Sequence, residues 1–294
     1  MTTSVTTFYR FVRLQDLPEL RQAIRDRCLA LGLKGTVLLA AEGINATLVG
    51  PHRQLETFIA WLREDARFCD IRPRWSETAR SPFRKLRVRL KREIVTLGRP
   101  DLDPAATTGK HVPPDAWDAL LEDPETLVID TRNRYEVSVG RFRGAVSPDT
   151  ESFRHFPDWV REQLDPQRHR RIAMYCTGGI RCEKATAFML EEGFPEVFQL
   201  EGGILRYLEE VPPERSQWDG ECFVFDDRVT VAHGNQDGSH QLCLGCGEPL
   251  QPGDEAHEHF EPGLCCPRCH HRLTPERRAR LAEKRRQDHN AGGG

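Results

Sequence analysis

The chain has 294 residues and a formal net charge of −3 at pH 7, with a mean hydropathy of −0.58. This length predicts two or three domains. The sequence contains no apolar run near the roughly 18 residues that a membrane-spanning helix needs, and its first residues lack the apolar core of a signal peptide. We therefore expect a cytoplasmic protein without a membrane partner. Because the net charge is not basic, any binding of nucleic acid must depend on local basic surfaces.

Strand and helix patterns alternate over the first hundred residues in the order βαββαβ. Strands are expected over 7–12, 36–41, 46–49 and 86–90, with one helix after Asp16 and another after Pro51. This order is typical of a ferredoxin-like (acylphosphatase-like) α+β domain, which we place at residues 1–98.

A basic stretch ends this first domain. Residues 79–92 carry seven basic side chains and no acidic one. Such a stretch can follow the phosphates of RNA, but a solvated sheet face in an arginine-rich chain explains it equally well. The candidate RNA contacts are Arg80, Arg84, Lys85, Arg87 and Arg89.

A polar linker rich in proline and glycine covers residues 99–111. Over residues 112–215, short apolar strands alternate with helices, which predicts a parallel α/β sheet. Ligands of such sheets bind beyond the carboxyl ends of the strands. Asp130 and Glu136 lie in this region, and ordinary ion pairs with arginine are favoured over a direct chemical role for either.

The strongest site signal lies at residues 171–187, where a buried strand leads through a glycine-bearing loop into a helix. Cys176 begins this loop and Arg181 ends it. Backbone N–H groups, the start of the helix and the arginine all favour an anion, so we expect Cys176 to be a reactive thiolate at neutral pH. Cys182 follows six positions later as a candidate redox partner, although packing alone explains it equally well.

The length of this loop separates two chemistries. Four residues lie between Cys176 and Arg181, whereas cysteine phosphatases have five residues between the cysteine and the arginine, in a wider loop that encloses a phosphoryl group. The shorter loop fits the terminal sulfur of a persulfide better.

Cysteines near the C-terminus have the spacing of a metal site. Two C-x2-C pairs stand nineteen residues apart, and in a chain with ten cysteines and no export signal they favour metal ligands over disulfides. They predict a structural Zn²⁺ held by Cys243, Cys246, Cys266 and Cys269. Cys265 is an alternative to Cys266, and four histidines are reserve ligands: His257, His259, His270 and His271. We expect a cysteine-rich module over residues 216–274 and a basic flexible tail over 275–294.

Three stretches together resemble the rhodanese-type tRNA uridine hydroxylases. They are AEGIN at residues 41–45, DTRNRYE at 130–136 and YCTGGIRCEKA at 175–185, and the resemblance spans about residues 5–270. It implies a central rhodanese domain and oxygen-dependent hydroxylation of the wobble uridine of tRNA to 5-hydroxyuridine. Molecular oxygen would then be a co-substrate and the anticodon stem-loop the partner. Cys176 matches the cysteine assigned as catalytic in that family, which is proposed to pass through a persulfide. No flavin or nicotinamide motif is seen.

Two alternatives stay open at the level of sequence. One is a plain sulfurtransferase that uses a Cys176 persulfide, although the flanking domains favour a large substrate over thiosulfate. The other is a non-catalytic RNA-binding scaffold, against which the intact loop with Cys176 and Arg181 argues.

Overall fold

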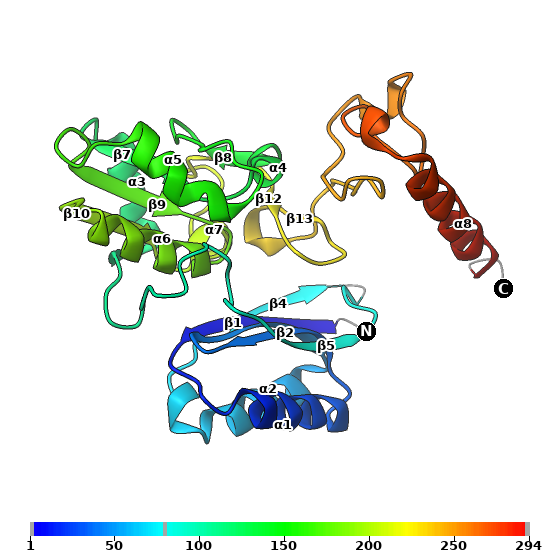
Figure 1. Ribbon diagram of the computed structural model, residues 1–294, viewed down its shortest axis with the longest axis horizontal. Helices are drawn as coiled ribbons and strands as arrows, with labels where there is room; N and C mark the ends of the chain where they lie inside the picture. Colours follow the sequence, from blue (N-terminus) through cyan, green and yellow to red (C-terminus); the bar gives the residue numbers. More distant parts are fainter. Residues whose placement is uncertain (1–2, 79–80, 292–294) are drawn as a thin grey trace.

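The computed structural model describes residues 3–78 and 81–291. Three parts follow one another along the chain (Figure 1): an N-terminal sheet with two helices, a central α/β domain, and a C-terminal module that ends in a projecting helix. Within the described ranges, no helix is both long and apolar enough to cross a membrane.

The N-terminal domain is a five-stranded sheet with both helices on the face that points away from the central domain (Figure 1). Its strand order is β4-β1-β3-β2-β5. Ile24 of the first helix and Phe58 of the second are buried in one core with Val37 and Leu39 of the sheet. The elements are β1 (Thr3–Phe11), α1 (Leu17–Ala30), β2 (Lys34–Ala40), β3 (Gly43–Gly50), α2 (His52–Arg63), a short 3-10 helix (Ala66–Phe68), β4 (Arg74–Thr78) and β5 (Leu86–Leu90).

The strand that completes the βαββαβ unit is β4, which sequence patterns did not predict. It pairs antiparallel with β1, whereas β5 extends the opposite edge of the sheet, parallel to β2. Of the five residues of β4 only Thr78 is buried, so the strand lacks the alternation that reveals strands in sequence. The expected strand over 86–90 is therefore real, but it is an addition to the ferredoxin-like order.

The central domain is a parallel sheet with the order β6-β10-β9-β7. Along β9, Ile172 and Met174 face one core, while Ala173 and Tyr175 face another, as the two-residue period of a strand requires. Both faces are thus covered. The elements are β6 (Lys110–Val112), α3 (Pro114–Glu122), β7 (Thr126–Asp130), α4 (Arg134–Val137), β8 (Gly140–Phe142), a 3-10 helix (Phe153–His155), α5 (Phe156–Gln163), β9 (Arg171–Tyr175), α6 (Ile180–Glu191), β10 (Glu196–Leu200) and α7 (Gly203–Glu210).

Residues 218–231 pack on this central domain, although the sequence grouped them with the cysteine-rich module. Strand β11 (Trp218–Gly220) pairs antiparallel with β8, and β12 (Cys222–Phe223) pairs with β13 (Thr230–Val231). The side chains of Trp218, Cys222 and Val231 belong to the same core as Tyr175. The central domain therefore continues beyond α7.

The cysteine-rich module follows, and it contains three 3-10 helices (His233–Asn235, Asp254–Ala256 and His270–Arg272). The segment expected to be a flexible tail forms helix α8 (Pro275–Ala291), which projects from the molecule (Figure 1). Its start is tied to the module, because Arg277 donates to the carbonyl of Gly245 and Arg278 pairs with Glu261, both at 2.5 Å.

Helix α6 joins the N-terminal and central domains through buried charges. Lys184 is fully buried and lies between two carboxylates of the N-terminal domain, Glu42 at 2.8 Å and Glu93 at 2.5 Å. The neighbouring Glu183 accepts a hydrogen bond from the hydroxyl of Tyr9 at 3.1 Å and lies 3.0 Å from the ring of His111. The AEGIN and CEKA stretches thus meet at the domain interface.

Candidate active site

The loop between β9 and α6 wraps backbone groups around Cys176. The N–H of Gly179 points at the Cys176 sulfur, 3.1 Å away. Gly179 has a φ of 98°, and a Cβ added there would lie 2.8 Å from the hydroxyl oxygen of Tyr9. The positive φ and the lack of space for a Cβ both favour glycine at this position.

The N-terminus of α7 holds the loop through backbone hydrogen bonds. The N–H groups of Ile204 and Leu205 donate to the carbonyls of Cys176 and Thr177 at 3.0 and 3.1 Å. A Cβ on Gly203 would lie only 2.4 Å from the Cys176 carbonyl oxygen, so glycine is needed for this approach. The cysteine is consequently held by two helix N-termini.

The surroundings of Cys176 favour its thiolate. Burial alone would raise its pKa, but a hydrogen bond from the Cys182 thiol, the charge of Arg181 and backbone N–H groups lower the pKa to about 6. For Cys182, burial and the adjacent Cys176 sulfur raise the pKa well above its usual value. At neutral pH these surroundings favour one thiolate and one thiol in the pair.

Arg181 acts on this thiolate through its charge. Its guanidinium donates two hydrogen bonds, at 2.6 and 2.7 Å, to the fully buried carboxylate of Glu136, and a third to Thr177. Asp130 likewise forms a buried ion pair with Arg132 at 2.6 Å. The carboxylates that the sequence singled out thus neutralise and orient arginines.

Residues that sequence patterns missed surround the loop. Tyr9 lies against Gly179, and Arg74 lies against Gly202, where an added Cβ would be 1.4 Å from the guanidinium. From the other side, the carbonyl of Phe223 accepts a hydrogen bond from Thr177, and Phe225 covers the Arg181 guanidinium at 5.7 Å. A Cβ on Gly178 would meet nothing within 4 Å, so the loop opens there.

Four cysteines converge as the spacing predicted. The sulfur atoms of Cys243, Cys246, Cys266 and Cys269 all lie within 4.8 Å of one another and can hold a metal ion. Cys265 is not a member of this group, and its sulfur points instead at the carbonyl of His259. The rings of His259 and His270 stack on each other at 4.5 Å, and none of the four reserve histidines joins the group in the part of the chain that the structure describes.

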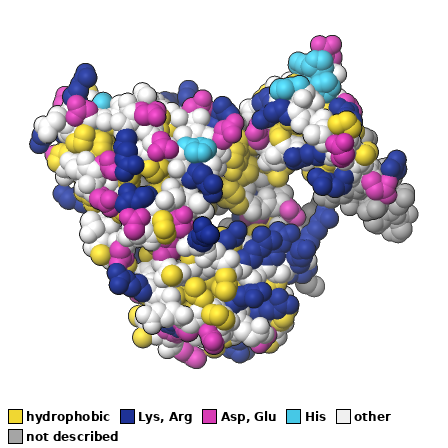
Figure 2. Space-filling model, viewed as in Figure 1, with side chains coloured by type: hydrophobic (Ala, Val, Ile, Leu, Met, Phe, Trp, Pro, Cys, Tyr) yellow, Lys and Arg dark blue, Asp and Glu magenta, His cyan; other side chains and the backbone are white. Residues whose placement is uncertain are grey.

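A basic surface lies around the start of β5, at one edge of the N-terminal sheet. Arg84, Lys85, Arg87 and Arg89 are exposed, whereas Arg80 lies outside the described residues. Figure 2 shows Lys and Arg side chains gathered at this end of the sheet, next to a hollow between the central domain and the C-terminal module. This basic surface therefore borders the hollow between the central domain and the C-terminal module.

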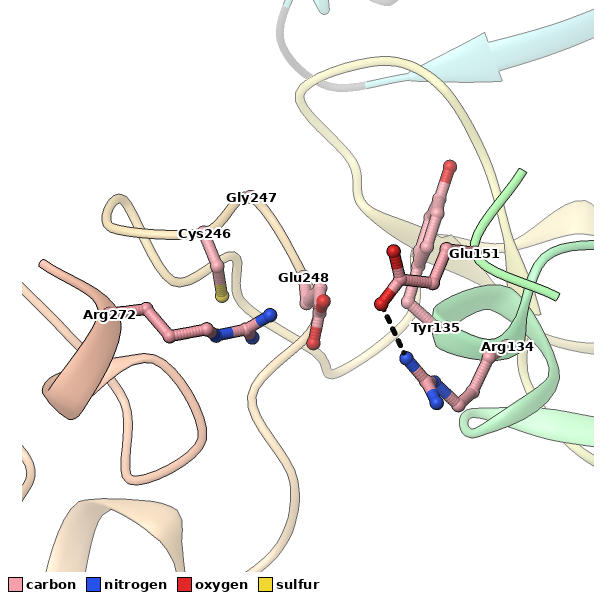
Figure 3. Close-up of a pocket in the computed structure, with 7 residues that line it drawn as sticks. All are labelled: Arg134, Tyr135, Glu151, Cys246, Gly247, Glu248 and Arg272. Atoms are coloured by element: carbon pink, nitrogen blue, oxygen red, sulfur yellow. Dashed lines mark hydrogen bonds and ion pairs between the residues drawn. The ribbon is translucent and has the colours of Figure 1, made fainter. Parts of the chain in front are cut away.

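A cavity of about 330 Å³ lies between α4 and the cysteine-rich module. Figure 3 shows that Arg134 and Tyr135 approach it from the central domain, while Cys246, Glu248 and Arg272 approach it from the module. Arg134 pairs with Glu151 across one wall at 3.0 Å. Cys176 is not part of its lining.

A parallel α/β sheet with a low-pKa cysteine between strand and helix is the framework of a cysteine-dependent enzyme. The rhodanese-like domain family matches residues 113–210, and the family described as UPF0176 acylphosphatase like domain matches residues 3–94.

Curated relatives cover nearly the whole chain. A protein of Picosynechococcus sp. is 48% identical over 96% of this chain and 95% of its own length. Proteins of Agrobacterium fabrum and Sinorhizobium fredii are 49% and 51% identical, each over 96% of this chain and 90% of their own. All three are named tRNA uridine(34) hydroxylase. The chain belongs to the tRNA uridine(34) hydroxylase family.

Proposed function

We propose that this protein hydroxylates the wobble uridine of tRNA to 5-hydroxyuridine, with molecular oxygen as co-substrate and Cys176 as the catalytic residue. The observation that carries the proposal is the buried Cys176 thiolate in a loop that opens at Gly178, within a chain whose relatives bear this activity in their names.

The thiolate supplies the nucleophile. Its addition to C6 of uracil forms an S–C6 bond and moves an electron pair towards C5, the carbon that receives oxygen. O₂ adds at C5 as a hydroperoxide, and loss of the C5 proton and of the thiolate then restores the ring and frees Cys176. The charge of Arg181 and the Gly179 N–H stabilise the thiolate before attack and after release.

Cys182 completes the redox balance. Insertion of one oxygen atom of O₂ reduces the other to water, which consumes two electrons and two protons. The freed Cys176 thiolate takes the outer oxygen atom of the hydroperoxide and becomes a sulfenic acid. The Cys182 thiol, which is already hydrogen-bonded to Cys176, then converts the sulfenic acid to a disulfide and water, so the two cysteines supply these electrons and protons. Each turnover then ends with a disulfide that an external thiol reductant must reopen.

Zinc is the metal that the four cysteines fit best. Zn–S bonds of about 2.3 Å in a tetrahedron place sulfur atoms about 3.8 Å apart. Three of the six S–S distances are 3.7, 3.8 and 3.8 Å, which agree with this value. With four thiolates and no open position, the ion stabilises the module and takes no part in the reaction.

The basic surface supports binding of the anticodon stem-loop. Arg84, Lys85, Arg87 and Arg89 are exposed along one sheet edge beside the hollow in Figure 2, where they suit contacts to RNA phosphates. A wobble base is unpaired in its loop, so it can be turned out towards Cys176 while the stem rests on this surface.

The test is nucleoside mass spectrometry of tRNA from cells that lack this gene and any redundant pathway to 5-hydroxyuridine. We expect the wild type to restore 5-hydroxyuridine derivatives only under oxygen, and Cys176→Ala to restore none. Cys69→Ala, which changes an exposed cysteine outside the site, is the matched control and restores them fully.

Two results would redirect the assignment. Unchanged nucleosides in the deletion strain would refute the hydroxylase and leave sulfur transfer from a Cys176 persulfide as the leading account. A tRNA that carries 5-fluorouridine at position 34 should form a covalent adduct with the wild type and none with Cys176→Ala. Absence of any adduct would rule out the addition to C6.

A further inference from the structure

The side chain of Phe225 is an aromatic ring that is largely exposed to solvent. Its relative exposure is 62%, and it is the single aromatic among the exposed large hydrophobic residues of the described chain. Exposed apolar residues occur singly on most proteins, so exposure alone indicates nothing. The position of this ring is what distinguishes it.

The ring lies beside the catalytic loop. It covers the guanidinium of Arg181 at 5.7 Å, and Arg181 is the residue whose charge lowers the pKa of Cys176. Phe225 also meets Phe223 edge to face at 5.3 Å, and Phe223 meets Tyr135 in the same way at 5.2 Å. An aromatic row thus runs from the loop to the cavity in Figure 3, where Tyr135 forms part of the wall.

The backbone that carries Phe225 is tightly held. The N–H of Val224 donates to the carbonyl of Val229 at 2.9 Å, which closes the β12–β13 turn. Within this turn Asp226 and Arg228 pair at 2.7 Å, and Arg228 also donates to the Ser76 hydroxyl on β4. The ring is therefore presented by a turn fixed to both domains, which lowers the ordering cost of binding.

We propose that Phe225 is the platform on which the uracil ring of the substrate stacks before Cys176 attacks it. The inference rests on the proposed function and adds the residue that holds the base. A flat apolar face suits a nucleobase, because stacking uses the π-face that every base has. The turn that carries Phe225 also contacts the basic stretch, because the N–H of Asp227 donates to the carbonyl of Pro82 at 3.3 Å. The basic surface would hold the phosphates, so the two parts of one nucleotide loop find complementary partners.

Stacking of a base on an aromatic side chain is worth about 1–3 kcal/mol by alanine substitution, which corresponds to a loss of about 5- to 150-fold. We expect Phe225→Ala to weaken binding of an anticodon stem-loop by this factor. Phe225→Trp keeps the stacking face and should bind within about threefold of the wild type, while Phe225→Leu keeps apolar bulk and should behave like alanine.

The experiment uses the full chain without oxygen, so that no turnover occurs. The probe is an anticodon stem-loop RNA with fluorescent pyrrolocytidine at position 34, whose emission falls when the base stacks. Wild type and Phe225→Trp should quench it, and Phe225→Ala should not. Leu29→Ala removes a similarly exposed side chain, 55% exposed on α1, and serves as the control that quenches normally.

A second measurement excludes a merely structural effect. In Phe225→Ala the melting temperature and the pH midpoint of thiolate absorbance at 240 nm should stay at wild-type values. Equal affinity and equal quenching for Phe225→Ala and wild type would overturn the stacking proposal. If the wild type instead fails to restore 5-hydroxyuridine in cells, the proposed function falls and this inference falls with it.

Discussion

Lys184 offers the sharpest test of how the two domains are joined. The substitution Lys184→Met keeps most of the side-chain volume but removes the cation between Glu42 and Glu93, which remain buried at the interface. Each carboxylate keeps a backbone donor, Ile94 for Glu42 and Leu97 for Glu93. In the variant, neither carboxylate has the positive charge of Lys184 beside it.

The expected loss follows from this burial. Removing one partner of a buried ion pair costs about 3–5 kcal/mol, because an uncompensated charge is left behind. For a cooperative unit of this size, 1 kcal/mol corresponds to about 2–4 °C, so the melting temperature should fall by about 6–20 °C. The triple variant Lys184→Met, Glu42→Gln, Glu93→Gln removes all three charges and should recover most of the loss.

Differential scanning calorimetry measures both variants, with Lys34→Met, a change of the exposed first residue of β2, as a control that shifts the melting temperature little. A single variant that melts within about 2 °C of the wild type would refute the role of the buried charge. A triple variant as unstable as the single one would refute it too, because the triple variant has no unpaired carboxylate at this place to account for the loss.

Four further outcomes are expected. Cys182→Ala removes a hydrogen-bond donor worth about 1.5–3 kcal/mol and should raise the thiolate midpoint of Cys176, read at 240 nm, from about 6 to about 7–8. Because the folded-state pKa of Cys176 lies below that of an unfolded cysteine, the stability it contributes is present above about pH 8.5 and is lost as the pH falls through about 6, which denaturant titrations against Cys176→Ala measure. Cys243→Ser should release the bound metal, detected by mass spectrometry, and make residues 243–273 sensitive to protease, whereas metal retained at one equivalent would argue against the four-cysteine site. Arg87→Gln with Arg89→Gln should reduce the slope of log affinity for tRNA against log salt by about 2, and an unchanged slope would remove these side chains from the RNA surface.

The loop around Cys176 could be predicted from the sequence because its chemistry depends on residues that are neighbours in the chain. A cysteine between a β-strand run and a glycine turn creates its own anion site, so Cys176 could be singled out without any tertiary contact. The metal site could be predicted in the same way, because each C-x2-C turn presents two sulfur atoms to one ion. The parallel sheet followed from alternating strand and helix patterns.

What sequence reasoning missed depends on contacts between distant segments. Tyr9 and Arg74 reach the loop from another domain, and β4 is half-exposed with no alternating pattern. Phe225 ends a short strand pattern over residues 222–225, but its place over Arg181 appears only in three dimensions. The role of Lys184 was hidden for the same reason, since a lysine in an amphipathic helix normally points to solvent.

The buried charges on α6 also limit how this gene can be rearranged. The helix that begins at the catalytic loop carries Glu183 and Lys184 one turn later, and both find their partners in the N-terminal domain. A rhodanese domain cut out by recombination would expose Lys184 without its two carboxylates. Glu183 would keep His111 and Gln199 but lose its hydrogen bond from Tyr9. The rhodanese domain is therefore difficult to transfer to another protein. A fusion to a foreign partner would have to bring matching carboxylates for Lys184 or replace Glu183 and Lys184.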